Sequence, residues 1–221
     1  MHVEVGFKLD KPLEYYRKMM DNHNCKNIYN AEVKDEYFTR EKMDNKSENE
    51  MKNSCVRIRT DRTLDENLNP VKEWKTSFQN HTLKSKNKSF DKTNEELNSM
   101  TKEEVMTLLE KEGFRKVFDT RKLDIHYSIE GLNGDIQFQP IDDIGLVVYY
   151  YNDDYIGMPF KEQRQKLIDE LNLVGFNFSY KDLGLDKLRT LYYGRELYSD
   201  NQNGWHYGWY KEITKTNWWI R

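Results

Sequence analysis

The chain has 221 residues, of which 37% are hydrophobic and 33% charged, and its formal net charge is −3. That length suits one large domain or two small ones, and the composition excludes an intrinsically disordered protein. The slightly acidic balance gives no general case for binding duplex nucleic acid, so an anion site would need a local concentration of basic residues.

Strands and helices alternate along the sequence. VEVGFKL at 3–9 alternates apolar and polar residues, which predicts a strand with one buried face. The clearest helix is 101–114, where Thr101 and Glu104 fit a capping box and Gly113 ends the pattern. Further strands are predicted over 32–41, 55–60, 71–78, 122–129, 134–141 and 146–153, and further helices over 11–23, 161–175 and 180–194.

Three segments lack such a pattern. Residues 40–54 are charged and aperiodic, which predicts an exposed, mobile loop. Residues 81–90 fit either a strand or a loop. Residues 196–221 form a Trp-rich extension, which we expect to pack on the preceding domain or to form a homo-oligomer contact, because exposed aromatic clusters often mark interfaces.

Cysteine usage and apolar runs bear on the compartment. Cys25 and Cys55 are the only cysteines and have no metal-binding spacing, which predicts reduced thiols in a cytoplasmic protein. No apolar run approaches the length of a membrane span, and the start MHVEVG does not resemble a signal peptide. We therefore expect no membrane partner.

The predicted strands share a division into an apolar face and a face of long polar side chains. Arg57 and Arg59, for example, alternate with Val56 and Ile58. If helices cover the apolar side of a closed sheet, the polar faces converge in a lumen that can hold a ligand. An open antiparallel sheet with one face in water gives the same alternation, so the pattern alone fits both.

Several short motifs add to this pattern in a fixed order. They are Glu4-x-Gly6-x-Lys8 on the first strand, Asp35 with Tyr37 and Phe38 in DEYF, Arg57-x-Arg59, Lys75 in EWKTSF, Lys122 with Tyr127 in KLDIHY, and SYKDLGL at 179–185. Together they resemble the motifs of the CYTH superfamily, the triphosphate tunnel enzymes. The resemblance spans 1–195, which we take as the tunnel domain.

The resemblance implies an α+β fold, namely an antiparallel eight-stranded tunnel barrel with helices packed outside. In such a tunnel, arginine and lysine bind phosphates, and carboxylates hold Mg²⁺ or Mn²⁺. It assigns phosphate binding to Lys8, Arg57, Arg59, Lys75 and Lys122. It assigns other lumen-lining positions to Glu4, Asp124, His126, Gln137, Gln139, Tyr149 and Tyr151.

The sequence departs from the family at the metal positions. Gly6 replaces the second glutamate of the first motif, Gln139 replaces an aspartate, and Tyr149 and Tyr151 replace the late Glu-x-Glu pair. Neither glutamine nor tyrosine substitutes for a metal-binding carboxylate. Glu4 remains as the metal candidate, and the carboxylates that could compensate are Asp35, Asp124, Asp135 and Asp142.

Two functional hypotheses follow. In the first, the protein binds a nucleotide or other polyphosphate in a basic lumen and sequesters it without turnover or a cofactor. In the second, it is a triphosphate phosphohydrolase or nucleotidyl cyclase of the CYTH type that uses Mg²⁺ or Mn²⁺ in a rewired site. The first hypothesis fits the retained basic residues and the missing carboxylates. His126 could act as an acid or base, but a lone histidine is more often structural.

Overall fold

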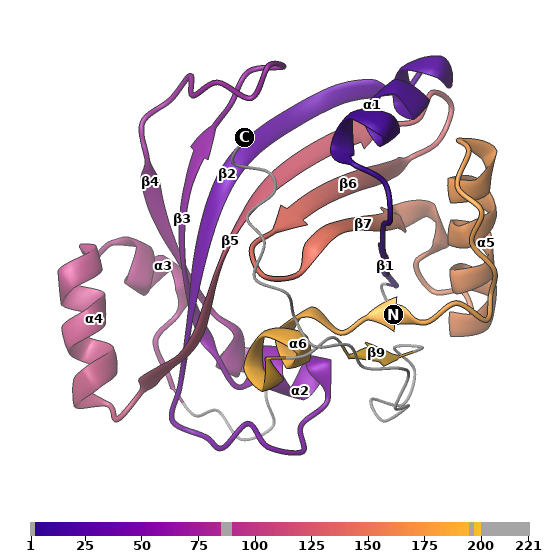
Figure 1. Ribbon diagram of the computed structural model, residues 1–221. Coiled ribbons are helices and arrows are strands. Elements are labelled where there is room, and N and C mark those ends of the chain that lie inside the picture. Colours follow the sequence, from indigo (N-terminus) through magenta and orange to yellow (C-terminus); the bar gives the residue numbers. More distant parts are fainter. Residues whose placement is uncertain (1–2, 85–89, 195–196, 200–221) are drawn as a thin grey trace.

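A computed structural model describes residues 3–84, 90–194 and 197–199. The fold is α+β, and an antiparallel sheet of seven strands dominates it in the order β1-β7-β6-β5-β2-β3-β4 (Figure 1). These strands are β1 (Val5–Lys8), β2 (Lys26–Thr39), β3 (Val56–Thr63), β4 (Lys75–Asn80), β5 (Arg115–Ser128), β6 (Gly134–Ile141) and β7 (Gly145–Asn152). The helices are α1 (Leu13–Asn22), α2 (Glu48–Asn53), α3 (Asn94–Asn98), α4 (Lys102–Lys111), α5 (Phe160–Leu173) and α6 (Lys187–Tyr193).

The sheet is strongly curved but open in the described part of the chain. The CYTH resemblance implied a closed barrel of eight strands, whereas the strand alternation fitted a closed or an open sheet. Among the described residues the sheet has seven strands, and β1 and β4 are its two edges. Of the ambiguous segment 81–90, residues His81–Lys84 form a 3₁₀ turn, and 85–89 lie outside the described residues. A small second sheet pairs β8 (Gly184–Leu185) with β9 (Tyr198–Ser199).

Asparagine side chains of α3 occupy part of the β4 edge. The amide group of Asn98 accepts from the backbone N–H of Phe78 at 3.0 Å and donates to its carbonyl oxygen at 2.8 Å. Asn94 accepts from the backbone N–H of Asn80 at 2.7 Å. These side chains satisfy backbone groups that a further strand would otherwise pair with, which helps to explain why the sheet ends here.

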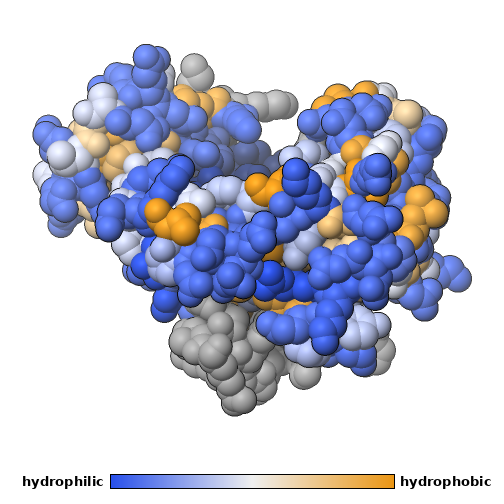
Figure 2. All heavy atoms as spheres, turned by 90° about the horizontal axis from the view of Figure 1, so that it is seen from above, coloured by the Kyte–Doolittle hydropathy of each residue, from blue (hydrophilic) through white to orange (hydrophobic). Residues whose placement is uncertain are grey.

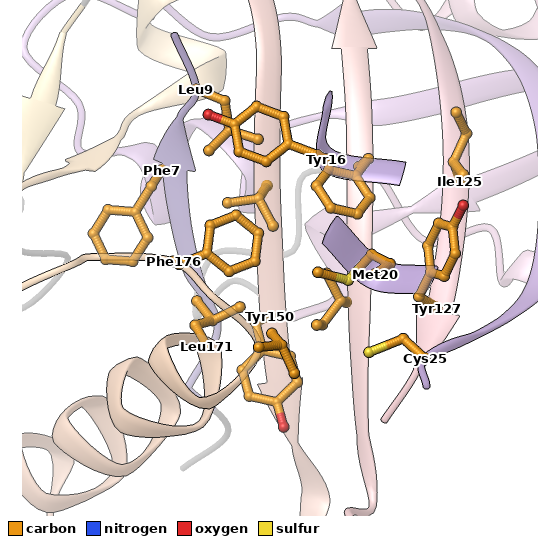
Figure 3. Packing of buried hydrophobic residues seen from close by; sticks show 14 of the residues in the cluster. Phe7, Leu9, Tyr16, Met20, Cys25, Ile125, Tyr127, Tyr150, Leu171 and Phe176 are labelled. Atoms are coloured by element: carbon orange, nitrogen blue, oxygen red, sulfur yellow. The ribbon is translucent and has the colours of Figure 1, made fainter. Parts of the chain in front are cut away.

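The larger hydrophobic core lies between the sheet and helices α1 and α5. We call the sheet face that the longer helices cover the outer face. Figure 3 shows Tyr16 and Met20 of α1 and Leu171 of α5 gathered over side chains of the outer face. Phe138 of β6 is fully buried there, with its ring centroid 5.9 Å from that of Tyr16. Burying a side chain of this size stabilises the fold by about 1.5–3 kcal/mol, so this face is fixed by its apolar residues.

A polar cluster fastens α5 to β7 within this core. The buried carboxylate of Glu170 accepts from the hydroxyl of Tyr150 at 2.7 Å, from Asn152 Nδ2 at 3.2 Å, and from the hydroxyl of Tyr155. The three donors are neutral, so the carboxylate is satisfied by hydrogen bonds.

A second core lies on the same face at the other end of the sheet, beneath α3 and α4. Val56, Ile58 and Phe78 of the sheet pack there against Leu97 of α3 and Leu109 of α4. Thr101 accepts from the backbone N–H of Glu104, which is the capping box predicted for α4. The prediction that helices pack outside the sheet is therefore confirmed for α1, α3, α4 and α5.

Helices α2 and α6 are different, because they cover one end of the opposite face, which we call the inner face. Met51 of α2 and Leu188 of α6 pack against Tyr37 and Phe118, whose side chains point inward from β2 and β5. The prediction of an exposed loop over 40–54 is wrong for this part. Glu48–Asn53 forms a helix with a complete capping box at Ser47, and Met51 is fully buried.

Most of the predicted Trp-rich extension, including all its tryptophans, lies outside the described residues, so its packing and any homo-oligomer contact stay predictions. In the part that the structure describes, no helix is long and apolar enough to cross a membrane. Cys25 and Cys55 are both buried free thiols. Seen from above, the described surface is mostly hydrophilic, and a hollow separates the two halves of the molecule (Figure 2).

Candidate functional site

The strand register gathers the predicted site residues on the inner face. Residues directly opposite each other on neighbouring strands share a face, and the register pairs Tyr149 with Gly6 and Gln137, and Asp35 with Arg59. With the alternation of side chains along each strand, this places on the inner face Glu4, Lys8, Arg57, Arg59, Lys75, Lys122, Asp124, His126, Gln137, Gln139, Tyr149 and Tyr151.

Arg59 is held by a buried carboxylate. Its Nε and one terminal nitrogen each donate to Asp35 at 2.8 Å, and the Asp35 side chain has no exposed surface. Burial would raise the pKa of Asp35, but the hydrogen bonds and charge of Arg59, with Arg57 and Lys122, lower it to about 2. Both oxygens of Asp35 are therefore committed to Arg59, which fixes the plane of its guanidinium group.

Arg57 is less committed, although it projects from the same face of the same strand. One terminal nitrogen donates to Gln79 at 2.5 Å, while its Nε lies 3.9 Å from Asp35. That Nε–H is buried and has no hydrogen-bond partner. Of the two arginines, Arg57 is therefore the one whose Nε–H is unused, whereas the Nε–H of Arg59 donates to Asp35.

Two lysines meet at the end of the inner face that α6 covers. Lys122 is almost fully buried and donates to Asp124 at 2.9 Å. Lys187 of α6 projects over the ring of Tyr149, with its Nζ 5.5 Å from the ring centroid. Burial lowers the pKa of Lys187 and the charge of Lys122 lowers it further, against the opposing effect of Asp35, Asp124 and Glu48.

Other basic side chains lie near Lys122 and Lys187. Desolvation lowers the pKa of Lys52 on α2, and Glu4 raises it. The nearby positive charges that lower the pKa of Lys52 further are those of Lys187, Arg57 and Lys84. Burial also lowers the pKa of His81 to about 4, with Arg57, Lys52 and Lys84 adding to the effect. His81 is therefore neutral near pH 7. We call this set the basic end of the inner face, and its members are Lys52, Arg57, Lys84, Lys122 and Lys187.

Lys75 and Glu4 lie toward the rim. The side chain of Lys75 is 73% exposed and lies 3.6 Å from the carboxylate of Asp61. Lys8 is half-buried on β1, and Glu4 is exposed just before it. Of the five predicted phosphate-binding residues, Arg57 and Lys122 belong to the basic end, Arg59 lies beside it, and Lys8 and Lys75 project from the edge strands.

Gly6 and Tyr149 fit each other at the positions where the CYTH motifs have glutamates. They are register partners, and a Cβ atom on Gly6 would lie 2.5 Å from Cε1 of Tyr149. The tyrosine ring thus occupies the space that a side chain at position 6 would need. Gly6 and Tyr149 therefore belong to one packing arrangement, and Gly6→Glu alone would clash with the tyrosine ring.

The inward carboxylates do not fit a resident Mg²⁺ or Mn²⁺. Asp35 and Asp124 are engaged by Arg59 and Lys122, and Asp135 accepts from His126 Nδ1 at 2.8 Å. Glu4 has Gly6 and Tyr149 beside it instead of carboxylates. Among the described residues, no group of three or more His, Cys, Asp or Glu side chains is arranged to hold a metal ion.

Hydrogen bonds link five polar side chains on β5, β6 and β7. Asp135 Oδ2 accepts from His126, from Gln137 Nε2 at 3.0 Å and from the Tyr151 hydroxyl at 3.4 Å. Gln137 Oε1 in turn accepts from Gln139 Nε2 at 3.4 Å. His126 is therefore held in a polar network.

Comparisons with known proteins address the fold. Neither the family models nor the curated proteins give a match. Among solved structures, the PH1819 protein from Pyrococcus horikoshii OT3 is similar with a TM-score of 0.52 and 14% identity, over 81% of this chain and 96% of that chain. At this identity, the similarity shows a shared fold alone.

Two further solved structures have lower TM-scores. The PH1012 protein from the same organism has a TM-score of 0.48 and 16% identity, over 80% of this chain and 92% of that chain. A "putative adenylate cyclase" from Vibrio parahaemolyticus has a TM-score of 0.48 and 9% identity, over 81% of this chain and 95% of that chain. At these TM-scores, neither similarity bears on fold or function.

Sequence reasoning missed Lys187, Lys52 and Thr120. The alternation did identify strands, but Lys187 and Lys52 reach the inner face from helices, whose position depends on tertiary packing. Thr120 is the register partner of Asp35, yet the predicted strand started two residues too late to include it. A longer strand prediction could have found Thr120, whereas no sequence signal marks Lys187.

Proposed function

We propose that this protein binds a phosphorylated small molecule of the nucleotide or polyphosphate class at the basic end of the inner face. The observation that carries the proposal is a concentration of buried polar atoms without hydrogen-bond partners on this face. In the described part of the chain, they include Arg57 Nε, Thr120 Oγ1 and the Tyr149 hydroxyl, each of which can donate a hydrogen bond to a ligand. Buried polar groups are normally satisfied, so such a cluster favours a ligand.

The charges support an anion as that ligand. At the basic end, Lys122 lies close enough to Lys187 for its charge to lower the pKa of Lys187, and burial removes the water that would screen the two side chains. Arg57 adds a positive charge and an unused N–H donor. A phosphate chain would relieve this repulsion and accept hydrogen bonds from arginine and lysine together.

The order of the CYTH-like motifs supports the same class of ligand, and the donor set supports binding without a resident metal. The alternative is a metal-dependent phosphohydrolase or cyclase. It would require carboxylates that are free to coordinate, whereas Asp35 and Asp124 already neutralise Arg59 and Lys122. Release of either carboxylate would leave a buried positive charge without its partner, at substantial cost.

A thermal-shift screen tests this proposal. Inorganic triphosphate, ATP and GTP are added to the protein in EDTA and again with excess Mg²⁺, because a ligand that binds the native state raises the melting temperature. We expect stabilisation in EDTA and no release of phosphate or cyclic nucleotide on prolonged incubation. Product formation that requires Mg²⁺ would support the enzyme alternative, and no stabilisation by any probe would overturn the proposal.

Arg57→Ala and Gln79→Ala form a matched pair for the same assay. Both remove one member of the 2.5 Å hydrogen bond between these side chains, but only Arg57→Ala removes a charge from the basic end. A charge-assisted hydrogen bond contributes about 1.5–3 kcal/mol, so Arg57→Ala should weaken triphosphate binding roughly 10- to 100-fold. Gln79→Ala should leave binding within a few-fold of wild type. Equal losses in both variants would contradict a direct role of Arg57.

A further inference from the structure

The amino group of Lys187 lies at the basic end without a polar partner of its own. Among the described residues it makes no hydrogen bond or ion pair, and its Nζ lies 5.5 Å from the centroid of the Tyr149 ring. The neighbouring Lys122 differs, because it donates to Asp124 at 2.9 Å. A carboxylate therefore holds the proton of Lys122, whereas the nearest partner of Lys187 is an aromatic ring.

Charged groups on β2, β5 and α2 face Lys187. Burial is the largest effect and lowers its pKa, and Lys122 lowers it further, so that the pKa is about 8. The carboxylates that oppose this lowering are Asp35, Asp124 and Glu48. Asp35 and Asp124 oppose it only in part, since each already forms an ion pair with another cation. The amine of Lys187 is therefore more easily deprotonated than that of an ordinary lysine.

Glu48 contributes little negative charge, because its carboxylate is engaged by the backbone of α6. Its two oxygens accept from the backbone N–H groups of Leu188 at 2.8 Å and Arg189 at 3.0 Å. Burial raises the pKa of Glu48 to about 7, and the charge of Asp186 adds to the rise. The carboxylate is thus only partly ionised near neutral pH, and its hydrogen bonds fix the start of the helix that carries Lys187.

These surroundings make Lys187 a nucleophile near neutral pH. With a pKa of about 8, its amine is neutral in roughly one molecule in four at about pH 7.5, against about one in a thousand at the ordinary lysine value of 10.5. A desolvated lysine beside a second cation is the kind that attacks carbonyl carbons. Lys187 is half-buried rather than sealed in the core, so a ligand on the inner face can reach it.

The groups around Lys187 suit a phosphate and a carbonyl group. Arg57 Nε has an unused N–H and lies 3.9 Å from Asp35, a carboxylate whose charge acts on Lys187. The Tyr149 hydroxyl, on the ring beside Lys187, is buried without a partner in the described part of the chain. Burial raises the pKa of Tyr149, so this hydroxyl keeps its proton and can donate to a carbonyl oxygen.

We propose that Lys187 forms a covalent imine with a phosphorylated aldehyde whose phosphate binds at the basic end. The amine nitrogen adds to the aldehyde carbon, the carbonyl oxygen leaves as water with the two amine hydrogens, and the imine nitrogen takes up a proton from solvent. The protonated imine keeps a positive charge, which the bound phosphate and the buried carboxylates stabilise. This inference rests on the proposed anion binding and adds a covalent step that nucleotides and polyphosphates, which carry no aldehyde, do not undergo.

Labelling with pyridoxal 5′-phosphate tests this inference, with pyridoxal as the control that lacks the phosphate. Each is added to the full chain in EDTA at about pH 7.5, the imine is reduced with borohydride, and the modified lysine is identified by peptide mass mapping. We expect Lys187 to react first, and about tenfold or more faster with the phosphorylated probe, as one charge-assisted hydrogen bond predicts. Excess inorganic triphosphate should protect Lys187, because it occupies the basic end and favours the protonated amine.

Lys187→Arg and Lys181→Arg form a matched pair for this assay. Both keep the positive charge, and Lys181 is exposed in the segment before β8. Lys187→Arg should lose the imine and Lys181→Arg should keep it. In the wild type, the rate of modification of Lys187 should be half-maximal near pH 8 instead of near 10.5. If Lys187→Arg does not fold, this pH profile and the protection by triphosphate test the inference on the wild type alone.

The outcomes separate this inference from the proposed function. If triphosphate stabilises the protein but Lys187 is not modified ahead of other lysines, the inference fails and the proposed function stands. Preferential modification of the exposed Lys52, or equal rates with pyridoxal and its phosphate, would also overturn the inference. If triphosphate neither stabilises the protein nor protects Lys187, the proposed function fails as well.

Discussion

Replacing Arg59 should destabilise the protein far more than replacing Arg57, although the two side chains lie two residues apart on one face. Arg59→Ala leaves the fully buried Asp35 carboxylate without both of its 2.8 Å hydrogen bonds. Breaking a buried ion pair from one side costs about 3–5 kcal/mol. Arg57→Ala removes one charge-assisted hydrogen bond to the neutral Gln79 and leaves no buried charge without its main partner, which predicts a loss of about 1.5 kcal/mol.

The pH dependence of the Arg59→Ala loss follows from the titration of Asp35. In the wild type, Arg59 and its neighbours overcome burial and lower the pKa of Asp35 from 3.8 to about 2. The stabilisation is therefore fully present above pH 3.8 and is lost as the pH falls through about 2, and it is on the order of 2 kcal/mol. In Arg59→Ala, burial dominates and the folded-state pKa of Asp35 rises, so ionisation opposes folding at neutral pH.

Urea unfolding of the wild type and both variants at pH 7, 5, 4 and 3 measures this difference. The gap between wild type and Arg59→Ala should be largest at pH 5–7 and should narrow toward pH 3. The smaller Arg57→Ala gap should narrow less, because Arg57 contributes less than Arg59 to lowering the pKa of Asp35. Equal losses for the two variants, or an Arg59→Ala gap that does not change with pH, would refute the assignment of Asp35 to Arg59.

Three further predictions concern packing and protonation. Gly6→Ala should lower the free energy of unfolding, measured with urea, by about 1–3 kcal/mol, because the new Cβ meets the tyrosine ring at 2.5 Å. In a Tyr149→Leu background the loss should be much smaller, and equal losses in both backgrounds would contradict this packing. Glu170→Gln should lower the free energy of unfolding by about 1.5–3 kcal/mol, because the carboxylate accepts from Tyr150 and two other neutral donors. Amide hydrogen exchange in α5 should become faster, and unchanged exchange would contradict this role of Glu170. Triphosphate binding near pH 8 should take up a fraction of a proton per site, because burial and Lys122 lower the pKa of Lys187 to about 8 and the anion reverses that lowering. Binding enthalpies in buffers of different ionisation enthalpy measure that uptake, and Lys187→Met should abolish it.

The sequence predicted which residues share the inner face, because strand periodicity is a local property. Period-two alternation placed Arg57, Lys122 and Gln139 on one side before any strand pairing was known, and the register agrees. Whether the sheet closes depends on contacts between distant segments. The Asn98 side chain that pairs with the backbone of β4 is one such contact, and alternation within a strand carries no information about it.

The sequence could not predict which partner each charged residue of the site has in the folded protein. Arg57 and Arg59 appear equivalent in VRIRT, and only the position of Asp35 on the neighbouring strand separates them. Lys187 reaches the inner face because α6 docks beneath the sheet, which depends on tertiary packing. The α2 helix, in contrast, could have been predicted, because Ser47 and Glu50 have the spacing of a capping box. The high charge of the segment favoured the prediction of a loop instead.

The most direct test of the account is a calorimetric titration of the wild-type protein with ATP and with inorganic triphosphate in EDTA, repeated for Arg57→Ala. The account predicts one binding site per chain that is saturable without a divalent metal and weakened roughly 10- to 100-fold by the substitution. Binding that appears only when Mg²⁺ is added, or an affinity that Arg57→Ala leaves unchanged, would contradict an anion site at the basic end of the inner face.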